Sequence, residues 1–125
     1  MIPGPRGIAV LGSLAGLSGV VMAALGSHAV PAMDDPAVYQ SWQSAVLIHL
    51  VHAAALLALA ALAARRPSRL AAWAALLFTA GIVLFSGSLY LALLTANISL
   101  NVTAPLGGMA LIAGWGLLAG HSLQT

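Results

Sequence analysis

Four long apolar segments, separated by short polar or helix-breaking stretches, dominate the pattern of hydrophobic positions along this chain. They cover Ile8–Val30, Trp42–Ala64, Leu70–Thr95 and Ala104–Gly120. A helix needs about 20 residues to cross the hydrocarbon core of a bilayer, and it satisfies its own backbone hydrogen bonds there. The pattern therefore predicts an all-α membrane protein, a single domain in which four transmembrane helices form an antiparallel bundle.

The first segment also resembles a cleavable signal peptide, because Arg6 precedes the apolar run and small residues occupy Ala24–Ala29. The run is longer than the roughly 7–15 residues typical of such a peptide, and its removal would leave three spans. We interpret it as the first of four spans.

Composition supports a lipid environment. Hydrophobic residues make up 62% of the chain and charged residues 5%, with a mean hydropathy of +1.05. A soluble domain carries roughly a quarter of its residues as charged side chains. The pI near 10.0 comes from four basic residues, so we expect no nucleic-acid partner. The absence of cysteine excludes disulfides, thiolate metal sites and thiol catalysis.

The few charges separate to opposite sides of the predicted bundle. One side has Arg6, Arg65, Arg66 and Arg69, and the first connection, on the other side, has Asp34 and Asp35. Basic residues are enriched in cytoplasmic connections of membrane proteins. This distribution predicts that both termini face the cytoplasm.

Glycines recur on the first and fourth segments at spacings typical of close helix packing. The expected packing residues are Gly12, Gly16, Gly19, Gly26, Gly116 and Gly120. The simplest interpretation is packing within one bundle, and the alternative is a homodimer surface.

Two histidines, His49 and His52, lie three residues apart within the second segment and therefore near one face. Thr79, Ser86, Tyr90 and Asn97 form a polar stripe on the third segment. Counted from the short second connection, His49 and Ser86 lie at nearly the same depth. We therefore expect a polar seam in which His49 faces Ser86 and Tyr90 lies nearer the outside. Ionisable residues at membrane depth are candidate functional sites, although such a seam can also serve only to set helix register.

Several specific chemistries fit these residues poorly. A bis-histidine haem needs imidazoles at matching depth, whereas His28 and His49 differ by about 7 Å. A metal site needs three or four protein ligands placed together, so the sequence gives only weak support for one. No span contains Asp or Glu, and no acid is placed to orient a catalytic imidazole. We expect no catalytic residues and no enzyme activity.

Five short strings place the chain beside a known family. They are GSHA at 26–29, W-x-x-A-x-x-x-H-x-x-H-A at 42–53, LFSGSLYL at 84–91, PLGG at 105–108 and GW at 114–115. In these the sequence resembles the domain-of-unknown-function 423 family of YgdD-like membrane proteins. The resemblance implies a four-helix, multi-pass protein of the bacterial inner membrane, and it implies no reaction and no cofactor.

The resemblance adds His28 to the candidate seam beside His49, His52, Ser86 and Tyr90. One departure is Ile48, where the family is expected to have Tyr or Gln, and this thins the polar seam.

The resulting hypothesis is a non-enzymatic binding or accessory protein in the lipid bilayer. Its partner would be a small lipophilic ligand, another membrane protein or a second copy of the chain. The alternative is a histidine-based conduit for protons or metal ions. The nearly apolar inner half, Leu56–Ala64 against Leu70–Leu77, counts against that alternative.

Overall fold

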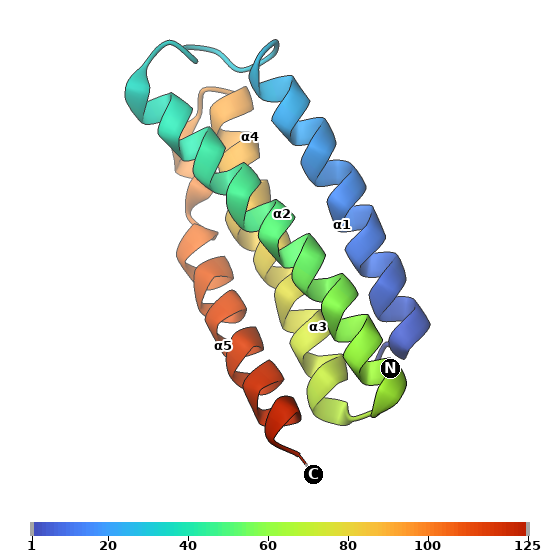
Figure 1. Cartoon of the computed structure of the whole chain (residues 1–125). Helices are drawn as coiled ribbons and strands as arrows, with labels where there is room; N and C mark the ends of the chain where they lie inside the picture. The colour runs from blue at the N-terminus through green and yellow to red at the C-terminus, as the bar shows by residue number, and fades with distance from the viewer. Residues whose placement is uncertain (1, 125) are drawn as a thin grey trace.

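The computed structural model describes residues 2–124, and helices joined by short connections account for this part of the chain (Figure 1). They are α1 (Pro5–Gly26), α2 (Pro36–Arg65), α3 (Arg69–Gly81), the π-helix η1 (Ile82–Gly87), α4 (Ser88–Leu94), the 3-10 helix η2 (Ile98–Asn101) and α5 (Ala104–Leu123). Because α3, η1 and α4 follow one another without a break, they form one continuous rod, Arg69–Leu94, which we call the third rod. Within the described residues four helices are long and apolar enough to cross a membrane, which confirms the predicted all-helical class.

Local capping explains where the helices begin. Asp35 precedes Pro36, and its Oδ1 accepts a hydrogen bond of 2.9 Å from the backbone N–H of Ala37, so α2 starts six residues before Trp42. Ser68 Oγ accepts from Ala71 N–H at 3.1 Å in the same way at the start of α3. The first helix lies closer to the N-terminus than predicted, since it begins at Pro5, ends at Gly26 and leaves the residues up to Val30 in a connection.

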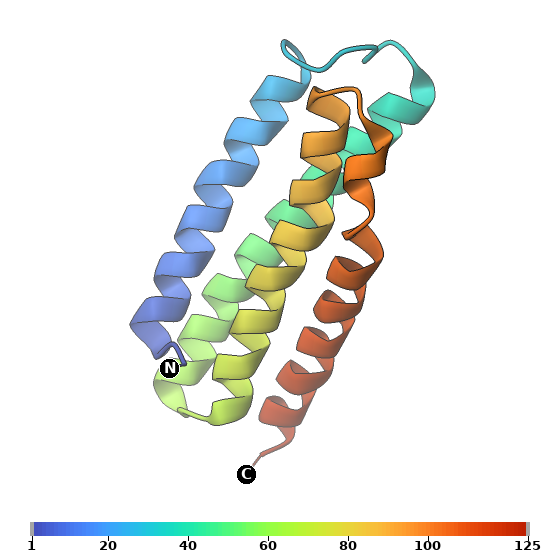
Figure 2. The same ribbon diagram turned by 180° about the vertical axis from the view of Figure 1, so that it is seen from behind.

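The two ends of the bundle differ in charge. The α2–α3 turn and both termini lie at one end (Figures 1 and 2), which we call the basic end because it holds Arg6, Arg65, Arg66 and Arg69. The opposite end, here the loop end, carries the α1–α2 and α4–α5 connections and both aspartates, Asp34 and Asp35.

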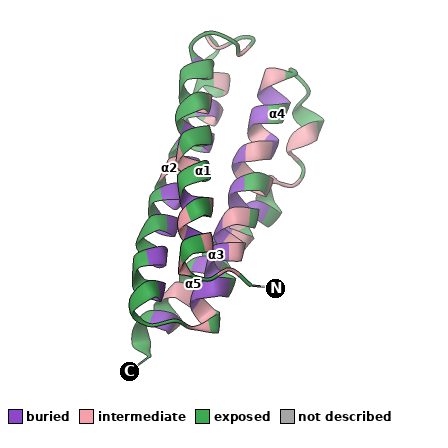
Figure 3. Ribbon diagram, turned by 90° about the vertical axis from the view of Figure 1, so that its right-hand side faces the viewer, coloured by how far each residue is buried: buried purple, intermediate pink, exposed green. Residues whose placement is uncertain are grey.

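The helix α2 occupies a central position. It packs against α1 along its length, and it also contacts the rod made of α3, η1 and α4. The helix α5 packs on the other side of that rod, mainly against α3 and η1. Because α1 rests chiefly on α2, most of its turns are exposed (Figure 3).

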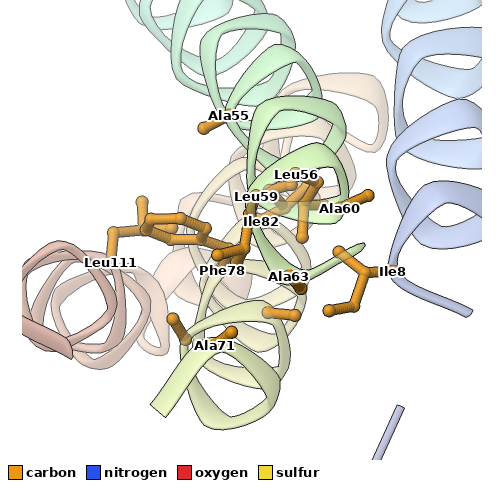
Figure 4. Close-up of a cluster of buried hydrophobic side chains, with 12 residues drawn as sticks. Ile8, Ala55, Leu56, Leu59, Ala60, Ala63, Ala71, Phe78, Ile82 and Leu111 are labelled. Carbon is orange, nitrogen blue, oxygen red and sulfur yellow. The ribbon is translucent and has the colours of Figure 1, made fainter. Parts of the chain in front are cut away.

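The apolar core has two parts. One lies toward the basic end and joins Leu56 and Leu59 of α2 to Phe78 of α3, with many alanines around them (Figure 4). The other lies toward the loop end around Trp42 and Tyr90. The alanines allow the helices to approach closely, which is how helices associate in lipid.

The π-helix η1 was not predicted from the sequence. A π-turn adds a residue to the helical turn and alters the local backbone hydrogen bonding. The Leu84 carbonyl accepts a hydrogen bond of 3.1 Å from the Thr103 hydroxyl at the start of α5. Beside it Gly107 lies so close to η1 that a Cβ atom would overlap the backbone nitrogen of Phe85. The crossing of α5 over the third rod therefore depends on a residue without a side chain.

The glycines predicted to pack helices fall into different classes. In α1, a Cβ at Gly12, Gly19 or Gly26 would press on side chains of α2, whereas Gly16 is looser, 4.0 Å from Ala53 Cβ. This face of α1 is therefore covered within one chain.

The expectation for α5 needs correction. A Cβ at Gly116 would meet nothing within 4 Å, and one at Gly120 would make only an ordinary contact of 3.4 Å with Leu70. The close contacts are instead at Gly107 and Gly114, which lie seven residues apart on the face turned toward the third rod. The sequence count chose a stripe on the wrong face of α5.

A matched pair of glycine variants tests the α5 crossing. We expect Gly107→Ala to lower stability by about 2 kcal/mol, because the new methyl group overlaps helix backbone that cannot move aside easily. The control Gly116→Ala should change stability little, since its surroundings are open. Thermal unfolding in detergent, followed by circular dichroism, measures both. Equal stability of the two variants would contradict the packing described here.

Candidate functional site

His49 lies at the junction of three rods. Its ring is buried on α2, with Nδ1 2.9 Å from the Tyr90 hydroxyl of α4 and Nε2 3.1 Å from Ser18 Oγ of α1. The Tyr90 ring in turn packs against Trp42, with 4.9 Å between ring centroids. The imidazole thus connects α2 to helices on both of its sides.

One neutral tautomer of His49 satisfies these hydrogen bonds. The Ser18 hydroxyl donates to the Leu14 carbonyl at 2.9 Å, so its oxygen is free to accept from the Nε2–H of His49. Nδ1 of the ring then accepts the proton of the Tyr90 hydroxyl. In this arrangement each polar proton has an acceptor.

His52 points to a different neighbour. Its Nδ1–H donates to the Ile48 carbonyl at 2.7 Å, and its Nε2 accepts a 2.9 Å hydrogen bond from the indole N–H of Trp115 in α5. The ring also packs edge-on against Phe78 at 5.3 Å between centroids. Because one nitrogen donates and the other accepts, His52 is neutral with the opposite tautomer from His49.

The two histidines therefore do not form one seam. Three residues on a helix differ by about 60° in direction, and on a central helix that is enough to reach different neighbours. His49 contacts α1 and α4, whereas His52 contacts α5. The predicted single seam is corrected to two separate clusters.

Ser86 does not face His49 as expected. Its hydroxyl donates to the Ala45 carbonyl at 2.7 Å, one helical turn from His49. Side chains lean toward the N-terminus of their helix, so in antiparallel neighbours His49 and Tyr90 lean toward each other. The long tyrosine covers the distance, and the short serine bonds to the backbone directly opposite it.

The remaining polar positions lie apart from the histidine clusters. His28 is exposed in the turn after α1, so the structure does not bring it to His49. The Thr79 hydroxyl donates to the Ala75 carbonyl of its own helix at 2.8 Å. Asn97 lies in the α4–η2 connection, where its Oδ1 accepts from Ser99.

Sequence reasoning missed two partners, Ser18 and Trp115. Ser18 lies 8 residues before the end of α1 and His49 lies 13 residues after the start of α2, so a depth count across the long α1–α2 connection does not place them at one level. No comparable count reaches Trp115, since the irregular η2 segment separates α4 from α5.

A groove opens beside the His49 cluster. It has a volume of about 370 Å³ and lies between α1 on one side and α2, α3, η1 and α4 on the other. Its walls are apolar, including Leu11, Leu14, Met22, Ile82 and Val83, while its polar groups are Ser18, His49, Thr79 and Tyr90. The groove exists because α1 leans on α2 and makes little contact with the third rod.

The histidine clusters do not form a metal-ligand set. Among residues 2–124 no group of three or more His, Cys, Asp or Glu side chains is placed to hold a metal ion. All four ring nitrogens of His49 and His52 already take part in hydrogen bonds.

Comparison with known proteins gives a consistent assignment. The profile of the family described as "Protein of unknown function (DUF423)" matches residues 22–108. The chain is 36% identical over 110 residues to the UPF0382 membrane protein YwdK of Bacillus subtilis, covering 85% of this chain and 87% of the relative. It is 35% identical over 108 residues to the UPF0382 inner membrane protein YgdD of Escherichia coli, covering 83% and 82%. No solved structure matches the chain.

The opposite tautomers of the two histidines provide a direct test of the site. We expect ¹⁵N chemical shifts to show Nε2 protonated in His49 and Nδ1 protonated in His52, because their partners differ as described. Protein labelled with ¹⁵N-histidine, with His52→Ala used for assignment, allows the measurement by NMR. The same tautomer at both positions would contradict the assignment of the donors and acceptors around His49.

Proposed function

Because the chain belongs to the DUF423 (UPF0382) family of membrane proteins, for which no reaction is known, we propose its function from the geometry of the site. It is a multi-pass membrane protein, and relatives are named inner membrane protein in Escherichia coli and membrane protein in Bacillus. The proposal is a non-enzymatic binding protein that holds a small lipophilic molecule in the groove beside α1. The observation that carries it is the buried His49–Tyr90–Ser18 hydrogen-bond network beside an otherwise apolar groove.

The size of the groove favours a small molecule over a partner helix. Its volume of about 370 Å³ lies within the range of roughly 300–1,000 Å³ typical of small-molecule sites. A transmembrane helix is about 10 Å wide and would need a much larger surface. From Leu11 to Met22 the groove follows α1 for about 16 Å, which suits a short hydrocarbon chain.

The groove opens to the side of the bundle. Leu14 and Val83 line it and are 57% and 62% exposed, on helices long and apolar enough to span a membrane. Exposed apolar side chains at this depth face lipid. A lipophilic molecule can therefore enter from the bilayer without passing through water.

The polar network supplies a place for a carbonyl or hydroxyl head group. The Ser18 hydroxyl donates to the Leu14 carbonyl, which also accepts a backbone hydrogen bond within the α1 helix. This hydroxyl can therefore rotate and donate to a ligand carbonyl at little cost. The oxygens of Ser18 and Tyr90 retain lone pairs that can accept from a ligand hydroxyl. The proposed occupant is thus a hydrocarbon chain with one carbonyl or hydroxyl head.

The alternative of a histidine-based conduit has less support. His49 and His52 lie in separate clusters with different partners. Toward the basic end, the core cluster contains only apolar residues, such as Leu56, Leu59 and Phe78. A proton or metal ion would have to cross this apolar region.

The orientation proposed for the bundle places the basic end in the cytoplasm. All four arginines lie at that end and both aspartates lie at the loop end. This distribution follows the enrichment of basic residues in cytoplasmic connections. Both termini would then be cytoplasmic.

Two glycine variants test the groove. We expect Gly87→Leu to remove the bound molecule, because Gly87 lines the groove and a Cβ there meets only an ordinary contact of 3.9 Å with the Ile82 carbonyl, so a larger side chain fits into the space. Gly116→Leu is the matched control, since it adds the same side chain to an open surface. Protein purified gently from native membranes is extracted, and co-purified lipophiles are identified by mass spectrometry.

Histidine variants add a second comparison. We expect His49→Ala to reduce retention of the molecule about fivefold through loss of roughly 1 kcal/mol of head-group interaction, and His52→Ala to leave retention unchanged. A wild-type protein free of lipophiles, or one that keeps them after Gly87→Leu, would contradict the proposal. If a partner protein co-purifies in stoichiometric amount with the wild type and is lost in Gly87→Leu, the occupant of the groove is a partner helix and not a small ligand.

The orientation can be measured separately because the chain has no native cysteine. We expect Ser27→Cys, at the loop end, to react with a membrane-impermeant maleimide on intact spheroplasts. Leu123→Cys, at an exposed position of the basic end, should react only after the membrane is opened. The reverse pattern would invert the proposed topology.

A further inference from the structure

A second cavity lies at the basic end, remote from the groove. It has a volume of about 410 Å³ and is lined by Leu62, Arg65 and Arg66 from the end of α2 and the turn that follows it, and by His121 and Ser122 from the last turns of α5. Unlike the groove, it is bordered mainly by polar and charged groups. It lies where the membrane-spanning helices end, and the function proposed above makes no use of it.

The positive charge of this cavity has no acidic side chain to neutralise it. The only side-chain carboxylates of the chain, Asp34 and Asp35, lie at the loop end. The C-termini of α2 and α5 contribute about half a negative charge each, and the two guanidinium groups of Arg65 and Arg66 exceed this. The cavity is therefore suited to an anion.

His121 adds a buried and oriented polar group. Its ring is only 4% exposed, and Nδ1 lies 2.7 Å from Ser68 Oγ. Ser68 Oγ accepts from Ala71 N–H as the cap of α3, and its own proton can be donated to Nδ1 of the histidine. The remaining ring proton is then on Nε2, the one ring nitrogen left for the cavity that His121 lines.

We propose that this cavity binds the phosphate of an anionic phospholipid head group. Arginine side chains bind phosphate through paired N–H donors, and the Nε2–H of His121 provides a further donor. Leu62 borders the cavity and is 42% exposed on α2, so the glycerol and acyl chains can continue along an apolar helix surface. A free phosphate ion has the same charged group but no tail to use this surface. Basic cavities between membrane helices are suited to such head groups.

Native mass spectrometry of the full-length chain tests the proposal. The protein is purified in detergent and mixed with equal amounts of phosphatidylglycerol and phosphatidylcholine. The wild type should retain phosphatidylglycerol in preference to phosphatidylcholine. We expect each arginine that lines the cavity to contribute about 1 kcal/mol, or a factor of about five, to binding of the anionic head group, so Arg65→Gln with Arg66→Gln should reduce this preference about twenty-five-fold.

The matched control is Arg6→Gln with Arg69→Gln, which also removes two positive charges from the basic end, at residues that do not line the cavity. It should keep the wild-type preference. Arg65→Lys with Arg66→Lys keeps the charge, loses the paired donors and should give an intermediate preference. All substituted arginines are exposed, and gel filtration verifies that each variant is folded.

Three outcomes would overturn the proposal. One is an equal loss of preference in Arg6→Gln with Arg69→Gln, which would indicate general surface charge. Another is a wild-type protein that retains both lipids equally. The third is displacement of phosphatidylglycerol by inorganic phosphate at comparable concentration, which would identify a phosphate-ion site without a role for the lipid tail.

Discussion

The arrangement of the bundle depends on the need of two buried imidazoles for hydrogen-bond partners at both nitrogens. An unpaired polar group inside an apolar membrane bundle is costly. His49 meets this need through Ser18 of α1 and Tyr90 of α4, and His52 meets it through its own helix and Trp115 of α5. The central helix α2 is thereby connected to every other rod of the bundle. These bonds set which faces of the helices meet.

Close approach of the helices makes these bonds possible. Lipid does not drive apolar surfaces together as water does, so the helices associate by tight packing. Gly19 lets α1 lie beside Leu50 and His49, and Gly107 lets α5 lie on the backbone of η1. At this crossing the Leu84 carbonyl accepts a hydrogen bond from the Thr103 hydroxyl. Packing and hydrogen bonding are therefore interdependent: a larger residue at these glycines would also separate the polar partners.

The same arrangement leaves two openings with different chemistry. Since α1 rests on α2 and makes little contact with the third rod, an apolar groove remains between them with the His49 network beside it. At the basic end, the ends of α2 and α5 border a charged cavity around His121. The groove is suited to a lipophilic chain with a small polar head, and the cavity to a phosphate group. The two proposed sites lie at different depths of the bundle and use no residue in common.

The sequence by itself determined the class of molecule. Four apolar segments of sufficient length must become helices in a bilayer. The short strings identified the family. It also identified His49, His52, Ser86 and Tyr90 as the polar groups to examine. These inferences rest on composition and on distance along one helix, which the local sequence contains.

Only the tertiary structure decided which of these groups meet. The separation of His49 from His52 follows from the position of α2 between its neighbours, and the pairing of Tyr90 with His49 follows from the lean of side chains across antiparallel helices. The π-turn and the outward face of Gly116 depend on how α5 crosses the third rod. Contacts between helices depend on rotation about their axes. A difference of a single residue rotates a face by about 100°, and the neighbouring helices, not the local sequence, select that rotation.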